Sequence, residues 1–105
     1  MVPKKLSEQV IKDLLIPATG NRVTYFAGAT IQGAKAPRGF GVRVTAAGSR
    51  AFILNYRLRG REYRFTIGGW PDWSALKAVR EARGLRQAST AGRIHSKSAL
   101  RPRVL

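Results

Sequence analysis

The chain has 105 residues, enough for one domain and little more. Hydrophobic residues make up 44% of the sequence, which allows a modest core and argues against wholesale disorder. The charge is one-sided: 20 lysine and arginine residues stand against 5 aspartate and glutamate residues, for a net charge of +15. This excess favours a polyanionic partner, with nucleic acid ranked before an anionic membrane surface.

Cysteine is absent, which excludes a disulfide framework and a thiolate zinc site and fits a reducing compartment. We find no run of 18 apolar residues and no pattern typical of a signal peptide, so we expect no membrane anchor. His95 stands apart from other metal ligands, and the acidic residues are scattered. We therefore expect no metal, no cofactor, no catalytic constellation and no small-molecule substrate.

The N-terminal part predicts a short amphipathic helix that begins after Ser7, a residue able to cap it. An apolar stripe supports the helix: Val10, Ile11, Leu14 and Leu15. Residues 22–26 are rich in β-formers and predict a short extra strand. Residues 27–38 are rich in glycine, alanine, lysine and proline, and we expect them to form an exposed loop.

Residues 39–67 organise the fold, because they contain three runs in which apolar and polar residues alternate. Strand side chains point to opposite faces with a period of two. The pattern therefore predicts a small three-stranded antiparallel sheet with one apolar and one basic face. The predicted basic face carries Arg43, Asn55, Arg57, Arg64 and Thr66. Turns are expected at residues 46–49 and 58–61, where Gly48 and Gly60 can adopt positive φ.

After the third strand, residues 68–73 are expected to break the sheet, and Ser74 can cap a second helix that ends at Arg86 or Gln87. Its apolar stripe would pack on the apolar face of the sheet. The fold class is therefore α+β, a three-stranded antiparallel sheet with one further short strand, packed against a C-terminal helix and joined by a short N-terminal helix. We expect a domain over residues 1–87 and a basic, disordered tail over residues 88–105.

The motifs GFGVRV, FILNYR, YRFTIG and PDWS, followed by a helix, resemble a known family. It is the N-terminal arm-type DNA-binding domain of phage and prophage tyrosine-recombinase integrases. The resemblance covers about residues 5–86. It implies that the open face of the sheet enters the major groove of DNA at arm-type attachment sites. It also implies that family members continue into core-binding and catalytic domains, which this sequence does not contain, as in a truncated integrase.

Carried onto this chain, the resemblance makes the basic-face residues the groove-facing candidates. It makes the turn residues Arg50, Arg59 and Arg61 candidates for backbone contacts. It further implies a bacterial cytoplasmic protein at the nucleoid, without enzymatic activity of its own, that acts in DNA integration. Other recombinase subunits are candidate partners.

Other classes of function remain open at this stage. An RNA-binding or ribosome-associated protein shares the charge and the small sheet, and aromatic side chains on the basic face would favour it. The phase of the alternation places most aromatic residues on the apolar face instead. A protein-interaction module of a recombinase assembly is a further alternative, and an enzyme is the remotest one.

Overall fold

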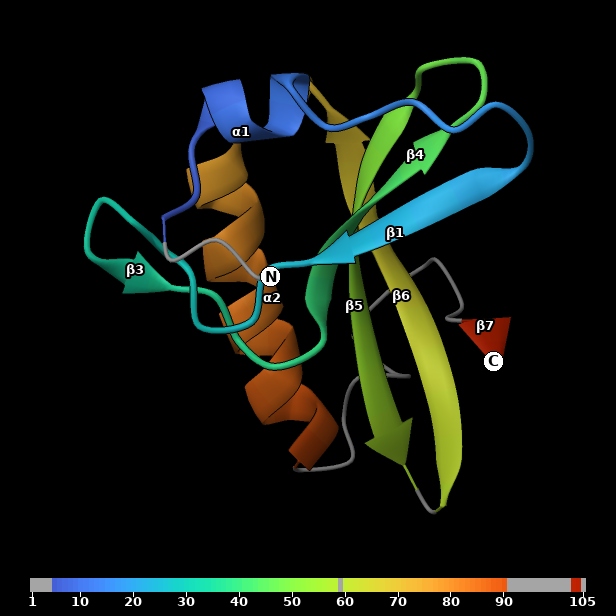
Figure 1. Ribbon diagram of the computed structural model, residues 1–105. Coiled ribbons are helices and arrows are strands. Elements are labelled where there is room, and N and C mark those ends of the chain that lie inside the picture. Colours follow the sequence, from blue (N-terminus) through green and yellow to red (C-terminus); the bar gives the residue numbers. More distant parts are fainter. Residues whose placement is uncertain (1–4, 59, 91–102, 105) are drawn as a thin grey trace.

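The computed structural model of the protein describes residues 5–58, 60–90 and 103–104 (Figure 1). Its elements follow in the order α1 (Glu8–Lys12), β1 (Asn21–Tyr25), β2 (Thr30–Ile31), β3 (Ala34–Lys35), β4 (Phe40–Thr45), β5 (Arg50–Leu58), β6 (Arg61–Trp70), α2 (Ala75–Thr90) and β7 (Arg103–Val104). The α+β class predicted from the sequence is confirmed. None of the described helices is long and apolar enough to cross a membrane.

An antiparallel sheet forms the body of the molecule, with the strand order β1-β4-β5-β6-β7 in the described part of the chain. The three predicted strands are β4, β5 and β6, and the predicted extra strand is β1, which pairs with β4. The two-residue strand β7 adds to the outer edge of β6 at Tyr63 and Arg64. Both turns occur where expected, with φ of +91° at Gly48 and +80° at Gly60.

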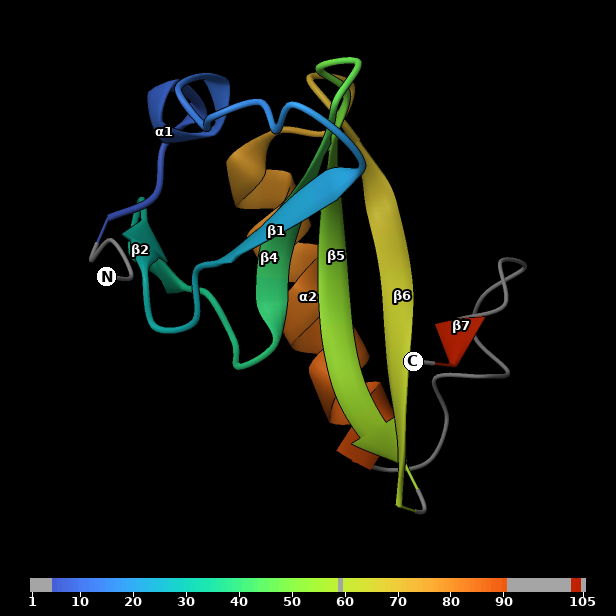
Figure 2. The ribbon, with the colours of Figure 1, turned by 45° about the vertical axis from the view of Figure 1, so that its right-hand side comes forward.

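Helix α2 covers one face of this sheet, which we call the back face (Figure 2). The helix begins after Ser74, whose Oγ accepts a hydrogen bond from the backbone N–H of Lys77 at 3.2 Å. The helix packs against β5, β6 and β3. Its apolar stripe and the inward side chains of the sheet form one buried core, which includes Phe40, Val42, Phe52, Leu54, Val79, Ala82 and Leu85. Burial of this apolar surface is the main source of stability for the fold.

The N-terminal helix begins at the predicted position, since the Ser7 Oγ accepts a hydrogen bond from the Val10 N–H. It ends at Lys12, earlier than the apolar stripe predicts. Ile11 is fully buried, whereas Leu15 is 74% exposed. The predicted inclusion of Leu15 in the apolar stripe is therefore wrong, because the chain has left the helix before reaching it.

The prediction of an exposed loop at residues 27–38 is wrong in part. Strands β2 and β3 form a small hairpin, and its turn uses positive φ at Gln32 (46°) and Gly33 (82°). Ala29, Ile31 and Ala36 belong to the buried core. These apolar residues cover the core beside α2. The alternation pattern cannot predict the hairpin, because each of its strands spans only two residues.

Strand β6 continues to Trp70, so the predicted break at Gly68 is wrong. The pairing shifts instead: Phe52 pairs with Gly68, and Ile53 pairs with Thr66. Ile67 is the extra residue of a β-bulge, which accentuates the twist of the strand. Gly68 also leaves room for the indole ring of Trp73, which would collide with any Cβ at this position.

The C-terminal boundary differs from the prediction as well. Helix α2 includes residues 88–90, and residues 103–104 pair with β6. The prediction of a disordered tail is therefore wrong for these residues, and its remainder lies outside the described residues. The sequence predicts a helix end at Arg86 or Gln87, because the predicted apolar stripe ends at Leu85.

Candidate nucleic-acid interface

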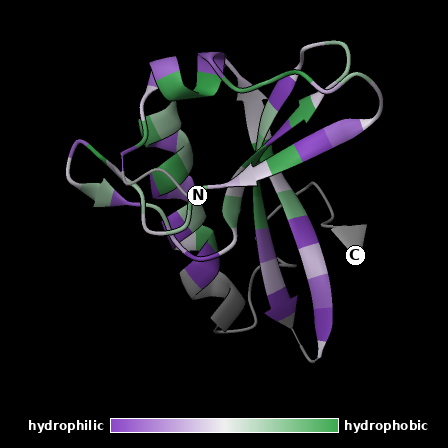
Figure 3. Ribbon diagram, in the orientation of Figure 1, coloured by the Kyte–Doolittle hydropathy of each residue, from purple (hydrophilic) through white to green (hydrophobic). Residues whose placement is uncertain are grey.

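Strands β5 and β6 extend past the end of β4 as a two-stranded ribbon. Phe40, the first residue of β4, pairs with Leu54, and β5 then continues to Leu58. The ribbon is defined here as residues 55–58 and 61–64. Much of it is coloured as hydrophilic in Figure 3. Beyond Leu54, β4 no longer lies beside the β5 edge of the ribbon.

The strand register decides which side chains share the face opposite α2, which we call the front face. Residues directly opposite each other in neighbouring strands point to the same side of a sheet. Asn55 pairs with Arg64, Arg57 with Glu62, and Ile53 with Thr66. Arg43, in β4, lies on the same side by this register. The structure thus brings the predicted basic-face residues together on one face.

A chain of hydrogen bonds crosses the front face from β1 to β6. The amide Nδ2 of Asn55 donates to the hydroxyl of Tyr25 at 2.6 Å, and Nε of Arg64 donates to Oδ1 of Asn55 at 3.0 Å. These contacts orient the guanidinium of Arg64, a half-buried residue. An arginine held in this way loses less conformational entropy when its remaining donors meet a ligand.

Tyr25 is the functional candidate that the sequence analysis did not assign to this face. The residue is 40% exposed, and its ring lies over Gly41, where a Cβ would be 3.1 Å from the ring carbon Cδ1. The alternation in β1 could not reveal this because both faces of that short strand are only partly buried. The missing side chain at Gly41 is the signal that could have indicated it.

Arg57 forms an ion pair with Glu62 across the ribbon. The Arg57 Nη2 and the Glu62 Oε1 lie 3.1 Å apart, and the two side chains are 69% and 58% exposed. An ion pair this exposed contributes little to stability, about 0–1 kcal/mol. Arg57 can therefore exchange the carboxylate for a phosphate or a base edge at small energetic cost.

Arg43 occupies the middle of the front face, between Val23 of β1 and Ala51 of β5. Its Nε is buried and has no hydrogen-bond partner within the described part of the structure. An unsatisfied buried donor is unfavourable, by roughly 1–3 kcal/mol.

The three arginines assigned to the turns have different surroundings. Arg50 is the first residue of β5, and its guanidinium donates to the carbonyl oxygens of Ile11, Lys12, Leu14 and Gly48 at 2.9–3.2 Å. It also lies 5.8 Å from the ring centre of Trp70. Arg50 thus fastens the end of α1 to the sheet, on the side away from the front face. Arg61 is exposed at the start of β6, and Arg59 lies outside the described residues.

The other aromatic residues of the sheet belong to the back face, as predicted. Phe40 stacks on Phe52 with ring centres 6.0 Å apart, and Tyr56 stacks on Tyr63 at 5.5 Å. Burial, and secondarily the neighbouring Tyr63, raises the pKa of Tyr56 to about 12. These rings stabilise the fold, so Tyr25 is the sheet aromatic that the front face offers within the described part of the chain.

No group of three or more histidine, cysteine, aspartate or glutamate side chains that could hold a metal ion occurs among the described residues. What the front face presents instead is a set of guanidinium forks, an amide, a phenol and a hydroxyl. Guanidinium and amide groups are the side chains that bind phosphates and base edges with paired hydrogen bonds.

The comparison with protein families agrees with this chemistry. A model of the Arm DNA-binding domain matches residues 8–99, which is most of the chain. The protein therefore belongs to the arm-type DNA-binding domain family of phage integrases, and domains of this family bind DNA in integrase-type proteins. The match extends past residue 87, where the sequence analysis placed the end of the domain. No relative was found among curated proteins.

Proposed function

We propose that the protein binds duplex DNA through the front face, with the β5–β6 ribbon inserted in the major groove at arm-type attachment sites. One observation carries the proposal: the ribbon extends beyond β4, and its polar side chains share the face opposite α2. The major groove of B-DNA admits a two-stranded ribbon. Membership of the Arm DNA-binding family supports DNA as the partner.

Within this proposal the residues have distinct roles. Arg43, Arg57 and Arg64 are the candidates for base contacts, because a guanidinium can bridge O6 and N7 of guanine. The amide of Asn55 suits adenine, and Thr66 can contact either a base or a sugar. Arg61, the first residue of β6, is a candidate for a phosphate contact. Arg59, outside the described residues, keeps the phosphate-contact role that the family resemblance implies. We leave Arg50 out, since its donors are occupied by backbone carbonyls.

We further propose that the domain acts as a DNA-binding module without catalysis of its own. In an integrase assembly it would tether recombinase subunits to arm-type sites, in the bacterial cytoplasm at the nucleoid. The front face supports this assignment because its side chains suit recognition rather than chemistry: the described residues there include no nucleophile paired with a base.

A salt titration of binding to a 20-base-pair DNA duplex tests the proposal. Wild-type protein is compared with Arg57→Ala/Arg64→Ala and with Lys12→Ala/Arg80→Ala, a control that removes the same charge from exposed positions on the two helices. We expect log K to fall with log salt by about 0.9 for each phosphate contacted. The front-face variant should lose about tenfold or more in affinity beyond the control, since each good base contact contributes about 1–3 kcal/mol.

Equal losses in the two double variants would mean that binding reflects net charge, and the front-face assignment would then be abandoned. The same titration against a 20-base-pair RNA duplex should give weaker binding, because the deep major groove of A-form RNA excludes a ribbon.

The exposed ring of Tyr25 favours a second candidate, the binding of single-stranded RNA. Aromatic side chains on a basic face can stack with unpaired bases. Under this alternative, Tyr25→Leu should weaken binding to a single-stranded oligonucleotide about tenfold or more and leave duplex DNA binding nearly unchanged. The DNA proposal predicts the reverse order of affinities for the wild type, with the duplex bound more tightly.

A further inference from the structure

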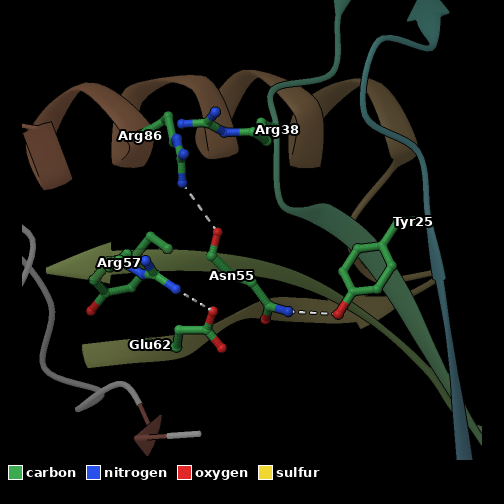
Figure 4. Close-up of a pocket in the computed structure, with 7 residues that line it drawn as sticks. Tyr25, Arg38, Asn55, Arg57, Glu62 and Arg86 are labelled. Carbon is green, nitrogen blue, oxygen red and sulfur yellow. Dashed lines mark hydrogen bonds and ion pairs between the residues drawn. The ribbon is translucent and has the colours of Figure 1, made fainter. Parts of the chain in front are cut away.

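A hollow of about 500 Å³ opens at the side of the ribbon, where β4 has ended and β5 continues (Figure 4). Residues from β1, β5, β6 and α2 and from the segment before β4 line it. The described lining consists of Tyr25, Arg38, Asn55, Tyr56, Arg57, Glu62 and Arg86. Among these residues the charges sum to +2, and the carboxylate is already paired with Arg57.

Two guanidinium groups meet in this hollow. Arg86 projects from α2 and donates from Nη1 to the backbone carbonyl oxygen of Asn55 at 3.2 Å. Arg38 comes from the segment between β3 and β4 and lies beside it (Figure 4). Burial and, to a lesser degree, the charge of Arg38 lower the pKa of Arg86. Two like charges held close together are unfavourable, and an anion between them would relieve the repulsion.

The position of the hollow indicates which anion it suits. In a major groove, a ribbon has a phosphate backbone on each side of it, and both backbones carry phosphates at regular intervals. The hollow lies at the β5 side of the ribbon, and it continues from the front face through Asn55 and Tyr25. A duplex bound on the front face would bring one of its backbones to Arg38 and Arg86.

We propose that this hollow binds a backbone phosphate of the bound DNA, with Arg38 and Arg86 as its ligands. The inference rests on the proposed function and extends it: α2 and the segment before β4 then contribute to the interface, in addition to the ribbon. Phosphate contacts fix the position of a protein on the duplex and carry no base information. Arg38 and Arg86 thus provide affinity and register, whereas the front face provides selectivity.

The test compares Arg38→Ala/Arg86→Gln with the charge-matched control Lys12→Ala/Arg80→Ala on two 20-base-pair duplexes of unrelated sequence. Neither control residue lines the hollow, and both are exposed. We expect the hollow variant to bind about tenfold more weakly than the control, equally on both duplexes, and to have a salt slope lower by about 1. The single variant Arg38→Ala retains the contact between Arg86 and Asn55 and should show part of the same loss.

If the hollow variant binds like the control, the phosphate site is overturned while the proposed function can stand. If wild-type protein binds duplex DNA no better than Arg57→Ala/Arg64→Ala does, the proposed function fails instead.

Nuclear magnetic resonance of the arginine Nε–Hε groups gives an independent readout. Addition of the duplex should shift the signals of Arg38 and Arg86, whereas the signal of Arg80 should keep its position. Shifts caused by inorganic phosphate but not by the duplex would assign the hollow to a free phosphate compound and overturn the backbone contact.

Discussion

Arg50 shows how an arginine in a basic sheet can belong to the fold rather than to the partner. Its donors end on carbonyl oxygens of Ile11, Lys12, Leu14 and Gly48, so it closes the end of α1, which has too few residues to be stable alone. Spacing in the sequence cannot distinguish this arginine from Arg61, because the helix that Arg50 contacts is about 38 residues away.

The first prediction concerns this residue. Arg50→Gln should lower the free energy of unfolding by about 2–3 kcal/mol, since charge-assisted hydrogen bonds are lost and carbonyl oxygens are left without partners. Urea unfolding measures the change. Arg61→Ala, at an exposed strand end, is the control and should change stability by less than about 0.5 kcal/mol. A similar small change for Arg50→Gln would contradict the structural role.

A second prediction concerns pH and Tyr56. The pKa of this phenol is raised from 10.0 to about 12 by burial and then by Tyr63, so the folded state favours the protonated form. The stabilising effect is fully present below pH 10, where both states hold the proton. It is lost as the pH rises from 10 to 12, because the unfolded chain ionises first. The loss amounts to about 2–3 kcal/mol.

Urea unfolding at pH values between 9 and 12 checks this dependence. Tyr56→Phe should flatten the decline, whereas Tyr25→Phe keeps Tyr56 and should leave it in place. A decline equally steep in both variants would assign the effect to other groups.

At the scale of elements, the close approach of the chain before β4 to β5 depends on Gly39. Its φ is +90°, and a Cβ here would collide with the carbonyl oxygen of Asn55. The close approach also allows the Asn55 N–H to donate to the Gly39 carbonyl at 2.9 Å. This contact fixes the point at which the ribbon leaves the rest of the sheet.

The third prediction follows from this contact. Gly39→Ala should destabilise the fold by more than about 3 kcal/mol, because the collision is with backbone and cannot relax through a side chain. Gly60→Ala is the matched control: its φ of +80° is similar, but no atom of the described residues beyond its chain neighbours lies within 4 Å of the added carbon, so it should cost only about 1–2 kcal/mol. Thermal unfolding of both variants checks the order. Equal costs would show that the backbone conformation alone matters.

The elements differ in how far the sequence predicts them. Strong alternation in residues 40–67 predicts three strands and their faces, since burial on one side fixes the phase. The β2–β3 hairpin escapes prediction because two-residue strands have no period. The phase of β1 is equally invisible, and with it the position of Tyr25. The register that places Tyr25 beside Asn55 comes from pairing with β4, which is information about tertiary structure.

At the scale of the whole molecule, Glu8 joins the two helices and the sheet. Its Oε2 accepts a hydrogen bond from the Trp70 indole N–H at 2.7 Å, and its Oε1 accepts one from the Ala75 N–H at 2.6 Å. The carboxylate therefore lies at the N-terminal ends of both α1 and α2, where negative charge is favourable. The sequence does not predict this role for Glu8, because its partners are more than 60 residues away.

The fourth prediction tests this junction. Glu8→Ala should lower the free energy of unfolding by about 2–3 kcal/mol, since two charge-assisted hydrogen bonds are lost. Chemical denaturation measures the change. Compared with the wild type, the variant should show a larger increase in the amide hydrogen-exchange rate in α1 than in β5. Asp13→Ala, which removes an exposed carboxylate that bonds Gln9, is the control and should have a small effect. Unchanged exchange in α1 would contradict the role of Glu8.

The exposure of the ribbon affects how the sequence of such a domain can change during evolution. The exposed positions on its front face, such as Arg57 and Glu62, contribute little to the folded state, and substitutions there should change stability by less than about 0.5 kcal/mol. The core and the contact between Gly39 and Asn55 remain unaffected by such substitutions. Under the proposed function, such substitutions can change the DNA sequence that the domain recognises one residue at a time, and each intermediate still folds.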